Sequence, residues 1–209
     1  MSKQRLEAFS DGVFAIVITL LILEVHLPTE GELSWAVLAQ ALPHVLAFIL
    51  SFVLVGTYWI AHHNMWGFVG KVDRYLLWLN LVLLLTVVFI PFPAALLGAH
   101  LTDPIAVTLY GLSLALVNAA GTCVWLYAMK RDLRVRGVPD RFVRFVAIIH
   151  SAPIAVYLLG IALASTHVAW SLVLYAAVPV FFILPNPLID REIATALAAI
   201  ERAGSRPGD

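Results

Sequence analysis

The sequence predicts an all-α integral membrane protein with six transmembrane helices. Hydrophobic residues make up 62% of the 209 residues and charged residues only 12%, whereas about a quarter of the residues of a typical soluble domain are charged. The mean hydropathy is +0.94. The apolar residues gather in six segments, and each segment is long enough to cross a hydrocarbon core, which takes about 20 helical residues.

The six apolar segments are separated by short polar connections. They cover residues 8–27, 43–62, 75–97, 104–129, 142–164 and 167–188. Pro28 ends the first segment, and a short amphipathic stretch at 32–42 leads into the second. The first segment is similar to a signal peptide, but the acidic residues at its two ends, Asp11 and Glu24, favour a helix that is retained.

The distribution of positive charge sets the orientation of the helices. All thirteen Lys and Arg residues fall on one side of the six-helix scheme. They are Lys3, Arg5, Lys71, Arg74, Lys130, Arg131, Arg134, Arg136, Arg141, Arg144, Arg191, Arg202 and Arg206. The connections on the other side hold Glu30, Glu32 and Asp103, and no Lys or Arg. Because cytoplasmic connections are enriched in positive charge, both termini and the two basic loops are predicted to be cytoplasmic.

No linker or low-complexity segment divides the chain. We therefore expect a six-helix transmembrane domain at 1–188 and a short cytoplasmic tail at 189–209. In the tail, Ile193, Leu197 and Ile200 recur at helical spacing, which predicts an amphipathic helix that lies on the membrane or packs on a neighbouring helix. Little chain remains outside the membrane to form a catalytic domain.

The sequence carries no motif for enzymatic chemistry. Zinc-binding histidine patterns, phosphate-binding glycine loops and Ser or Cys nucleophile motifs are absent, and the single cysteine, Cys123, excludes an internal disulfide. We therefore expect no enzyme, no cofactor and no resident metal. The formal net charge of zero gives no reason to expect a nucleic acid partner. The TVGYG filter sequence of ordinary potassium channels is also absent.

The first helix carries a stripe of large apolar side chains. On a wheel of 100° per residue the stripe comprises Phe9, Gly12, Ile16, Leu20, Leu23 and Leu27. Thr19 lies at its edge, and Asp11 lies on nearly the opposite side. Periodicity alone favours ordinary contact of this stripe with lipid or neighbouring helices. The other interpretation is a hydrophobic constriction around a symmetry axis, which gates ions by dewetting.

Asp11 heads this helix. The uncharged stretch that follows, residues 12–23, is only about 18 Å long at 1.5 Å per residue, so Asp11 or Glu24 lies near or below the membrane surface. Asp11 can accept hydrogen bonds from neighbouring helices, and Ser10 offers a hydroxyl at the same level. We interpret this group as a clamp between helices in preference to an ion site. Asn80 in the third segment is a further polar candidate, although it could equally be a satisfied amide between packed helices.

Two adjacent histidines, His62 and His63, close the second segment at the same level. Adjacent helical residues point to different faces, so the pair is a poor metal site. One of them is a candidate hydrogen-bond partner for Asp11 or Ser10, and the other is expected to face the interface or solvent. Two interfacial aromatics flank them, Trp59 and Trp66.

These residues resemble the signature of a known family. Arg5-x-x-x-Phe9-Ser10-Asp11, followed by Gly-Val-Phe-Ala-Ile, is similar to the first-helix motif of the endosomal/lysosomal potassium channels (transmembrane protein 175 and its prokaryotic relatives). Trp59-x-x-His62-His63 is also typical of the family. The length and the six helices match the single-repeat prokaryotic members, so the resemblance covers essentially the whole chain.

The resemblance implies a homotetramer in which four copies of the first helix surround a pore. The family constriction is an aliphatic ring five residues after the motif aspartate, which is Ile16 here. Further pore layers fall at Thr19, Leu20 and Leu23, and Thr19 is the polar layer implicated in favouring potassium.

The resemblance also implies a clamp at the cytoplasmic ends of the helices. Its members are Arg5, Phe9, Ser10 and Asp11, with one of His62 and His63.

The implied function is a passive potassium-permeable channel with modest selectivity over sodium, in the plasma (inner) membrane of a prokaryote. Its partners are further copies of the chain, potassium ions and membrane lipids. One alternative is a proton-coupled secondary transporter or exchanger that uses Asp11 and a histidine, but the sequence shows no broken-helix pair or inverted repeat of the kind such transporters often have. An intramembrane enzyme or a structural membrane subunit is a weaker alternative.

Overall fold

A computed structural model describes residues 2–26, 34–131 and 133–204 of the chain. In these ranges nearly all residues are helical, and no β-strand occurs. The helices are α1 (Lys3–Leu20), the 3-10 helix η1 (Leu21–Glu24), α2 (Trp35–Gln40), α3 (Leu42–Gly67), α4 (Arg74–Val88), α5 (Pro91–Ala99), α6 (Pro104–Lys130), α7 (Asp140–Leu163), α8 (Val168–Ile183) and α9 (Pro187–Gly204). Pro28, Glu30 and Glu32 lie outside the described residues.

The helices account for the predicted membrane spans. Five stretches are long and apolar enough to cross a membrane, namely Lys3–Glu24, Leu42–Gly67, Arg74–Ala99, Pro104–Lys130 and Asp140–Leu163. The sixth predicted span, 167–188, covers α8 and the first two residues of α9. α8 reaches the length of a span only together with α9, and the two helices are bent by 47°. The protein is therefore a multi-pass helical membrane protein.

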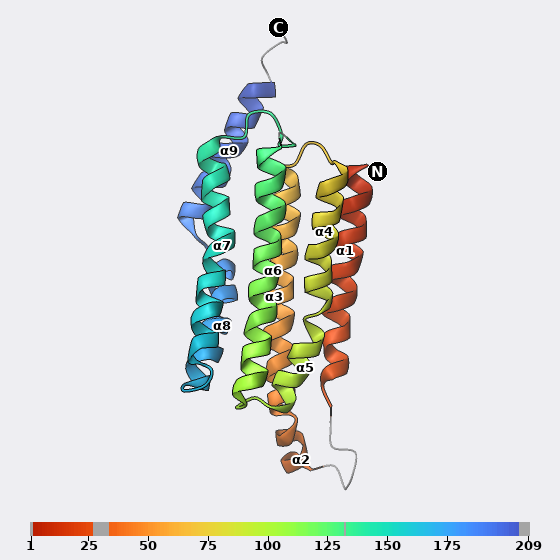
Figure 1. Ribbon diagram of the computed structural model, residues 1–209, viewed down its shortest axis with the longest axis vertical. Coiled ribbons are helices and arrows are strands. Elements are labelled where there is room, and N and C mark those ends of the chain that lie inside the picture. The colour runs from red at the N-terminus through yellow and green to blue at the C-terminus, as the bar shows by residue number, and fades with distance from the viewer. Residues whose placement is uncertain (1, 27–33, 132, 205–209) are drawn as a thin grey trace.

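The long helices form one elongated bundle (Figure 1). α1 packs on α3 and α4, and α6 packs on α4 and α7. α1 and α4 lie at one edge of the bundle and α7 and α8 at the other. The start of α1, the α3–α4 connection, the α6–α7 connection and α9 all lie at the same end, whereas α2 lies at the opposite end. This arrangement agrees with the topology that the positive charges predict.

Aspartates cap two of the long helices. The Asp73 carboxylate accepts a hydrogen bond from the backbone N–H of Leu76 at 2.7 Å, and Asp103 accepts one from Ile105 at 2.7 Å. The second oxygen of Asp73 accepts a bond from the Tyr127 hydroxyl at 2.7 Å, which joins α4 to α6. Desolvation by itself would raise the pKa of the Asp73 carboxyl, but the hydrogen bonds from Leu76 and Tyr127 outweigh it and lower that pKa.

The third span differs from the expected continuous helix. α4 ends at Val88 and α5 starts at Pro91, with Phe89 and Ile90 between them. Pro91 has no N–H to continue the helical ladder, and Pro93 follows within the same turn. Prolines remove a backbone donor and clash with the preceding turn, so they break the helix here. The third predicted span is confirmed as one apolar crossing at Arg74–Ala99, with a local break between α4 and α5.

The second span also extends further than predicted. α3 continues to Gly67 instead of ending at His62. His62 and His63 consequently lie more than one turn before the helix end, and they do not close the helix.

α9 packs on a neighbouring helix. Ile193 and Ile200 lie against the hydrophobic core, Ala196 is fully buried, and Leu197 remains half exposed. The guanidinium of Arg141 at the start of α7 donates to the carboxylate of Glu192 at 2.6 Å. Of the two arrangements expected for the tail, the structure has the one in which it docks on another helix.

A buried tyrosine joins α6, α7 and α8. The ring of Tyr175 lies against Gly111 of α6 and Gly160 of α7, and its hydroxyl donates to the Val107 carbonyl at 3.3 Å. A Cβ atom at either glycine would overlap the Tyr175 side chain. Close packing of these three helices therefore depends on glycine at both positions.

Candidate pore helix

α1 has two distinct faces. One face, formed by Leu6, Ser10, Phe14, Val17 and Leu21, is buried against the bundle. The other face carries the predicted stripe, and its side chains stay exposed: Ile16 is 59%, Leu20 43% and Leu23 66% exposed. Phe9 and Gly12 are exposed on the same face, while Leu27 lies outside the described residues. The stripe therefore remains available for contact beyond this chain.

Thr19 adds one hydroxyl near this stripe. Its side chain is exposed, and its Oγ1 donates to the backbone carbonyl of Ile16 at 2.8 Å. The hydroxyl is thus held within the helix, and its oxygen keeps lone pairs that can accept a further contact.

Ser10 enters a buried hydrogen-bond chain that crosses three helices. The Asn80 amide of α4 donates to Ser10 Oγ at 3.0 Å, and Ser10 donates to the Leu6 carbonyl at 2.9 Å. On its other side, Asn80 Oδ1 lies 2.9 Å from Nε2 of His62 on α3. Ser10, His62 and Asn80 are all buried. The chain therefore fastens α1 to α3 through α4.

His62 Nε2 has a second neighbour. The indole N–H of Trp66 points at it from 2.8 Å. An indole nitrogen only donates, so this bond needs Nε2 unprotonated, whereas a bond to Asn80 Oδ1 needs Nε2 protonated. The two bonds belong to different tautomers of the ring. His62 thus bonds Asn80 in one tautomer and Trp66 in the other.

Asp11 uses a different partner. Its Oδ1 accepts a hydrogen bond from the indole of Trp59 on α3 at 2.9 Å. Trp59 is 39% exposed, and its ring lies 6.0 Å from the ring of His63 at a tilt of 34°. Asp11 and Ser10 are adjacent in sequence, yet Asp11 is bonded directly to α3 and Ser10 is bonded to Asn80 of α4. Because α1 begins at Lys3, both residues lie inside the helix, and the expectation that Asp11 heads it is wrong.

The structure brings only some of the expected clamp residues together. Ser10 and His62 share the buried chain, and Asp11 and His63 both lie beside Trp59. Arg5 is exposed and makes no hydrogen bond or ion pair within the described residues, and Phe9 is 51% exposed. Neither histidine bonds Asp11 or Ser10 directly.

Two members of the clamp were not expected from the sequence. Trp59 and Trp66 act as hydrogen-bond donors, whereas their positions near a helix end favour a role as interfacial aromatics. Their spacing holds a usable signal, because Trp66 lies four residues after His62 and so on the same face of α3. Within the described residues, no group of three or more His, Cys, Asp or Glu side chains could hold a metal ion.

Comparison with known proteins identifies the family. The family model described as "Endosomal/lysosomal potassium channel TMEM175" matches residues 5–91. A potassium channel of Chryseobacterium sp. (strain P1-3) is 34% identical over 197 residues, which cover 92% of this chain and 98% of that protein. The chain belongs to the TMEM175 family. This is a family of channels and not of enzymes.

Other TMEM175 proteins show similarity of different extent. The crystal structure of a "lysosomal potassium-selective channel TMEM175 homolog" from Chamaesiphon minutus superposes with a TM-score of 0.75 at 29% identity and covers 86% of this chain and 95% of that one. The human endosomal/lysosomal proton channel TMEM175 is 42% identical over 84 residues, which are 35% of this chain and 17% of the human protein. The TMEM175 fold thus extends over most of the chain, and the vertebrate similarity covers a limited stretch.

Proposed function

We propose that this TMEM175 protein is a passive potassium-permeable channel in which α1 lines the pore. The observation that carries this proposal is the exposed aliphatic face of α1. Its opposite face is buried, Asp11 is bonded to Trp59 of α3, and Ser10 is bonded to Asn80 of α4. A helix held firmly on one side, with unpartnered aliphatic side chains on the other, suits a position around a shared axis.

Four copies of the chain surround this axis in the proposed channel. The names of the bacterial relatives and the fold shared with a potassium-selective TMEM175 homologue support a channel, and the fourfold assembly is what the resemblance of the first-helix motif implies. The four Ile16 side chains form the narrowest ring, and Thr19, Leu20 and Leu23 form further layers. The buried chain through Asn80 and the Asp11–Trp59 contact hold each α1 in register.

The proposed ring discriminates between ions by the cost of dehydration. An aliphatic constriction offers no oxygen ligands, so an ion that passes it loses water without replacement. Potassium is larger than sodium and holds its water less tightly, so it loses less free energy in the ring. Selectivity is therefore modest and favours potassium, and Thr19 supplies the one hydroxyl layer.

The proposed location is the plasma (inner) membrane of a prokaryote. The thirteen basic residues place both termini on its cytoplasmic side.

The decisive experiment is Ile16→Ala in proteoliposomes. A smaller side chain widens the ring and lowers the dehydration barrier, so potassium flux rises several-fold and the potassium-to-sodium preference shrinks. Ion flux and the reversal potential under a potassium/sodium gradient measure the two effects. Ile148→Ala is the matched control, because Ile148 is 65% exposed on α7 and lies away from α1. Unchanged flux and selectivity in Ile16→Ala would remove Ile16 from the constriction.

A further inference from the structure

An apolar groove lies in the bundle outside the α1 stripe. It runs between α3, α7 and the junction of α8 with α9, and its volume is about 400 Å³. Its walls include Ile60, Met65, Phe145, Ile149 and Ile183. These residues belong to membrane-spanning helices or border them, so the molecules that reach the groove come from the bilayer.

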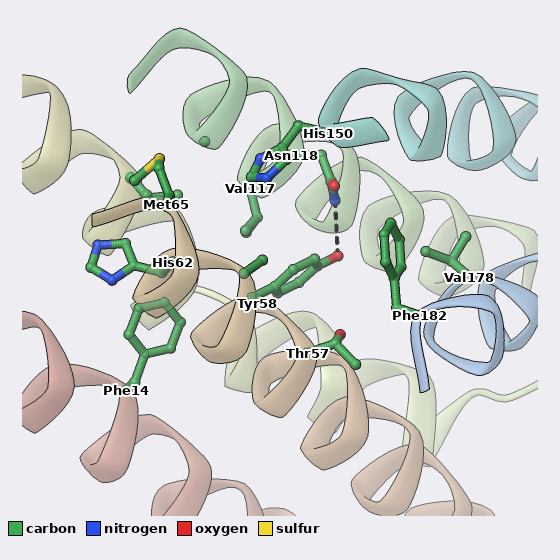
Figure 2. Close-up of a pocket in the computed structure, with 13 residues that line it drawn as sticks. Phe14, Thr57, Tyr58, His62, Met65, Val117, Asn118, His150, Val178 and Phe182 are labelled. Atoms are coloured by element: carbon green, nitrogen blue, oxygen red, sulfur yellow. Dashed lines mark hydrogen bonds between the residues drawn. The ribbon is translucent and has the colours of Figure 1, made fainter. Parts of the chain in front are cut away.

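The groove continues inward to a smaller cavity of about 70 Å³. The two share the residues Thr57, Ala61, Met65, His150 and Phe182. Figure 2 shows Phe14 and His62 at one end of the inner cavity and Val178 and Phe182 at the other. Phe14 belongs to the buried face of α1. The path therefore leads from the membrane to the back of the proposed pore helix.

Several polar groups along this path are already bonded to protein, whereas the side chains of His150 and Asn64 have no hydrogen bond within the described residues. The Tyr58 hydroxyl accepts a bond from the Asn118 amide at 3.1 Å and lies 3.2 Å from the Tyr157 hydroxyl. Thr57 Oγ1 donates to the Leu54 carbonyl at 2.7 Å. The remaining surface of the groove and the inner cavity is largely hydrocarbon, so an acyl chain can pack against it.

A basic pocket adjoins the groove. A polar pocket of about 180 Å³ at the starts of α7 and α9 shares Phe142 with the groove and is also lined by Arg141, Arg191 and Glu192. Arg141 is paired with Glu192 at 2.6 Å, while Arg191 is exposed and has no bonded partner within the described residues. Two guanidinium groups and one carboxylate leave a net positive charge, which suits an anionic headgroup.

The spacing of these two parts matches an amphiphile. Arg141 and His150 are nine residues apart on α7, which is about 13 Å along a helix. The basic pocket lies at the end of the bundle where the positive charges gather, and this is the side that faces anionic lipid in a cell membrane. An acyl chain that starts at the pocket reaches the inner cavity.

We propose that this groove binds an anionic phospholipid of the cytoplasmic leaflet. Its phosphate lies against Arg191 and Arg141, and one acyl chain lies in the groove with its end directed toward Phe14.

Native mass spectrometry of the intact protein tests the acyl-chain part. Protein extracted from vesicles of phosphatidylglycerol and phosphatidylcholine in equal amounts is expected to retain phosphatidylglycerol. Ala61→Phe fills the junction of the groove and the inner cavity, so retention falls. Ala155→Phe adds the same ring at an exposed site of α7 outside both cavities and leaves retention unchanged. Equal retention in wild type and Ala61→Phe would overturn the proposal.

Arg191→Gln tests the headgroup part at an exposed side chain that the fold does not need. One Arg near anionic lipid is worth about 1 kcal/mol, so the preference for phosphatidylglycerol over phosphatidylcholine is expected to fall about fivefold. Arg136→Gln removes the same charge from a connection outside the pocket and keeps the preference. An unchanged preference in Arg191→Gln would exclude the headgroup site. Size-exclusion chromatography shows whether Ala61→Phe folds. If it does not fold, the Arg191→Gln measurement tests the lipid site by itself.

The inner cavity reaches Phe14 on α1, so potassium flux is a second measurement of lipid binding. This measurement rests on the proposed function. Potassium flux of the wild type is expected to change with the phosphatidylglycerol fraction of the vesicle, and flux of Ala61→Phe is not. Equal dependence in both would contradict a link between the groove and α1. Lipid retention is measured without any ion flux, so failure of the lipid site and failure of the pore are distinguishable.

Discussion

Ser10 and Asp11 hold α1 through contacts of different character. Ser10 is buried in a chain in which every bond lies away from water, whereas Asp11 binds the half-exposed indole of Trp59. Buried polar groups lose more free energy when a partner is removed, because they cannot bond to water instead. The Ser10 side of the clamp therefore contributes more to stability than the Asp11 side.

Asn80→Ala tests the buried chain. It leaves Ser10 Oγ without its donor and His62 without one of its neighbours, and each unsatisfied buried group costs about 1–3 kcal/mol. We expect a lower thermal unfolding midpoint in detergent. Asn64→Ala is the control, because Asn64 is exposed on α3. Equal midpoints for the two variants would show that Asn80 is not a structural link.

Asp11→Asn separates the channel from the proton-coupled alternative. The Asn Oδ1 atom can accept the Trp59 N–H as the carboxylate does, but the amide cannot carry a proton. A passive channel keeps its potassium flux in this variant. Abolished flux together with saturable, proton-coupled transport in the wild type would favour the transporter.

The histidine pair shows where residue-level prediction reaches its limit. The sequence indicates that one histidine joins the clamp and one faces outward, and the structure has His62 buried and His63 exposed. Which of them turns inward depends on the rotation of α3 against α1 and α4, and an apolar helix carries little information on that rotation. Asn80 was a candidate from its polarity alone, but its place between Ser10 and His62 depends on the packing of three helices.

At the scale of elements, apolar length predicts the spans well and their internal geometry less well. The boundaries of α6 and α7 agree with the predicted segments to within two residues. The break between α4 and α5 is caused by Pro91 and Pro93, because proline interrupts the hydrogen bonds of a helix. Both prolines are visible in the sequence, but hydropathy alone does not register their effect on the backbone. In the extension of α3 to Gly67, His62 and Trp66 are both buried, and His62 is within hydrogen-bond distance of Trp66 and of Asn80, so polar side chains are accommodated inside the helix bundle.

Gly111→Ala tests the helix packing around Tyr175. The new methyl group overlaps the Tyr175 hydroxyl, and overpacking costs about 1–3 kcal/mol. A lower thermal midpoint is therefore expected. Gly121→Ala on the same helix is the control, because its new Cβ has only the His150 ring at an ordinary distance of 3.9 Å. A midpoint that falls equally in both variants would attribute the effect to α6 itself and not to Tyr175.

At the scale of the whole molecule, one chain leaves an apolar face of its first helix exposed. The Ile16, Leu20 and Leu23 side chains are 59%, 43% and 66% exposed, and the same residues are the proposed pore lining. The resemblance of the first-helix motif to TMEM175 channels predicted the family, and the comparisons confirm it. The number of subunits could not be predicted from composition or residue spacing. Fourfold symmetry relates separate copies of the chain, so it produces no repeat within one sequence.

Assembly as a tetramer is tested with cysteines on a Cys123→Ser background. Ile16→Cys places four thiols around one axis, so a short bis-maleimide reagent joins subunits, and native mass spectrometry gives four times the chain mass of 22.9 kDa. Ile148→Cys on the outer edge of the bundle stays uncross-linked. Cross-linking at Ile148 but not at Ile16 would place a different face at the symmetry axis.

The one-sided fastening of α1 has a mechanical consequence. Its side-chain bonds to other helices, through Ser10 and Asp11, lie near the middle of α1, while η1 at the far end contacts α3 and α5 without a side-chain hydrogen bond to either helix. Polar bonds have fixed directions, and apolar contacts allow sliding. If α1 tilts, we therefore expect it to rotate about a point near Asp11. Leu23 lies farther along the helix from Asp11 than Ile16 does, so Leu23 is displaced by a larger distance.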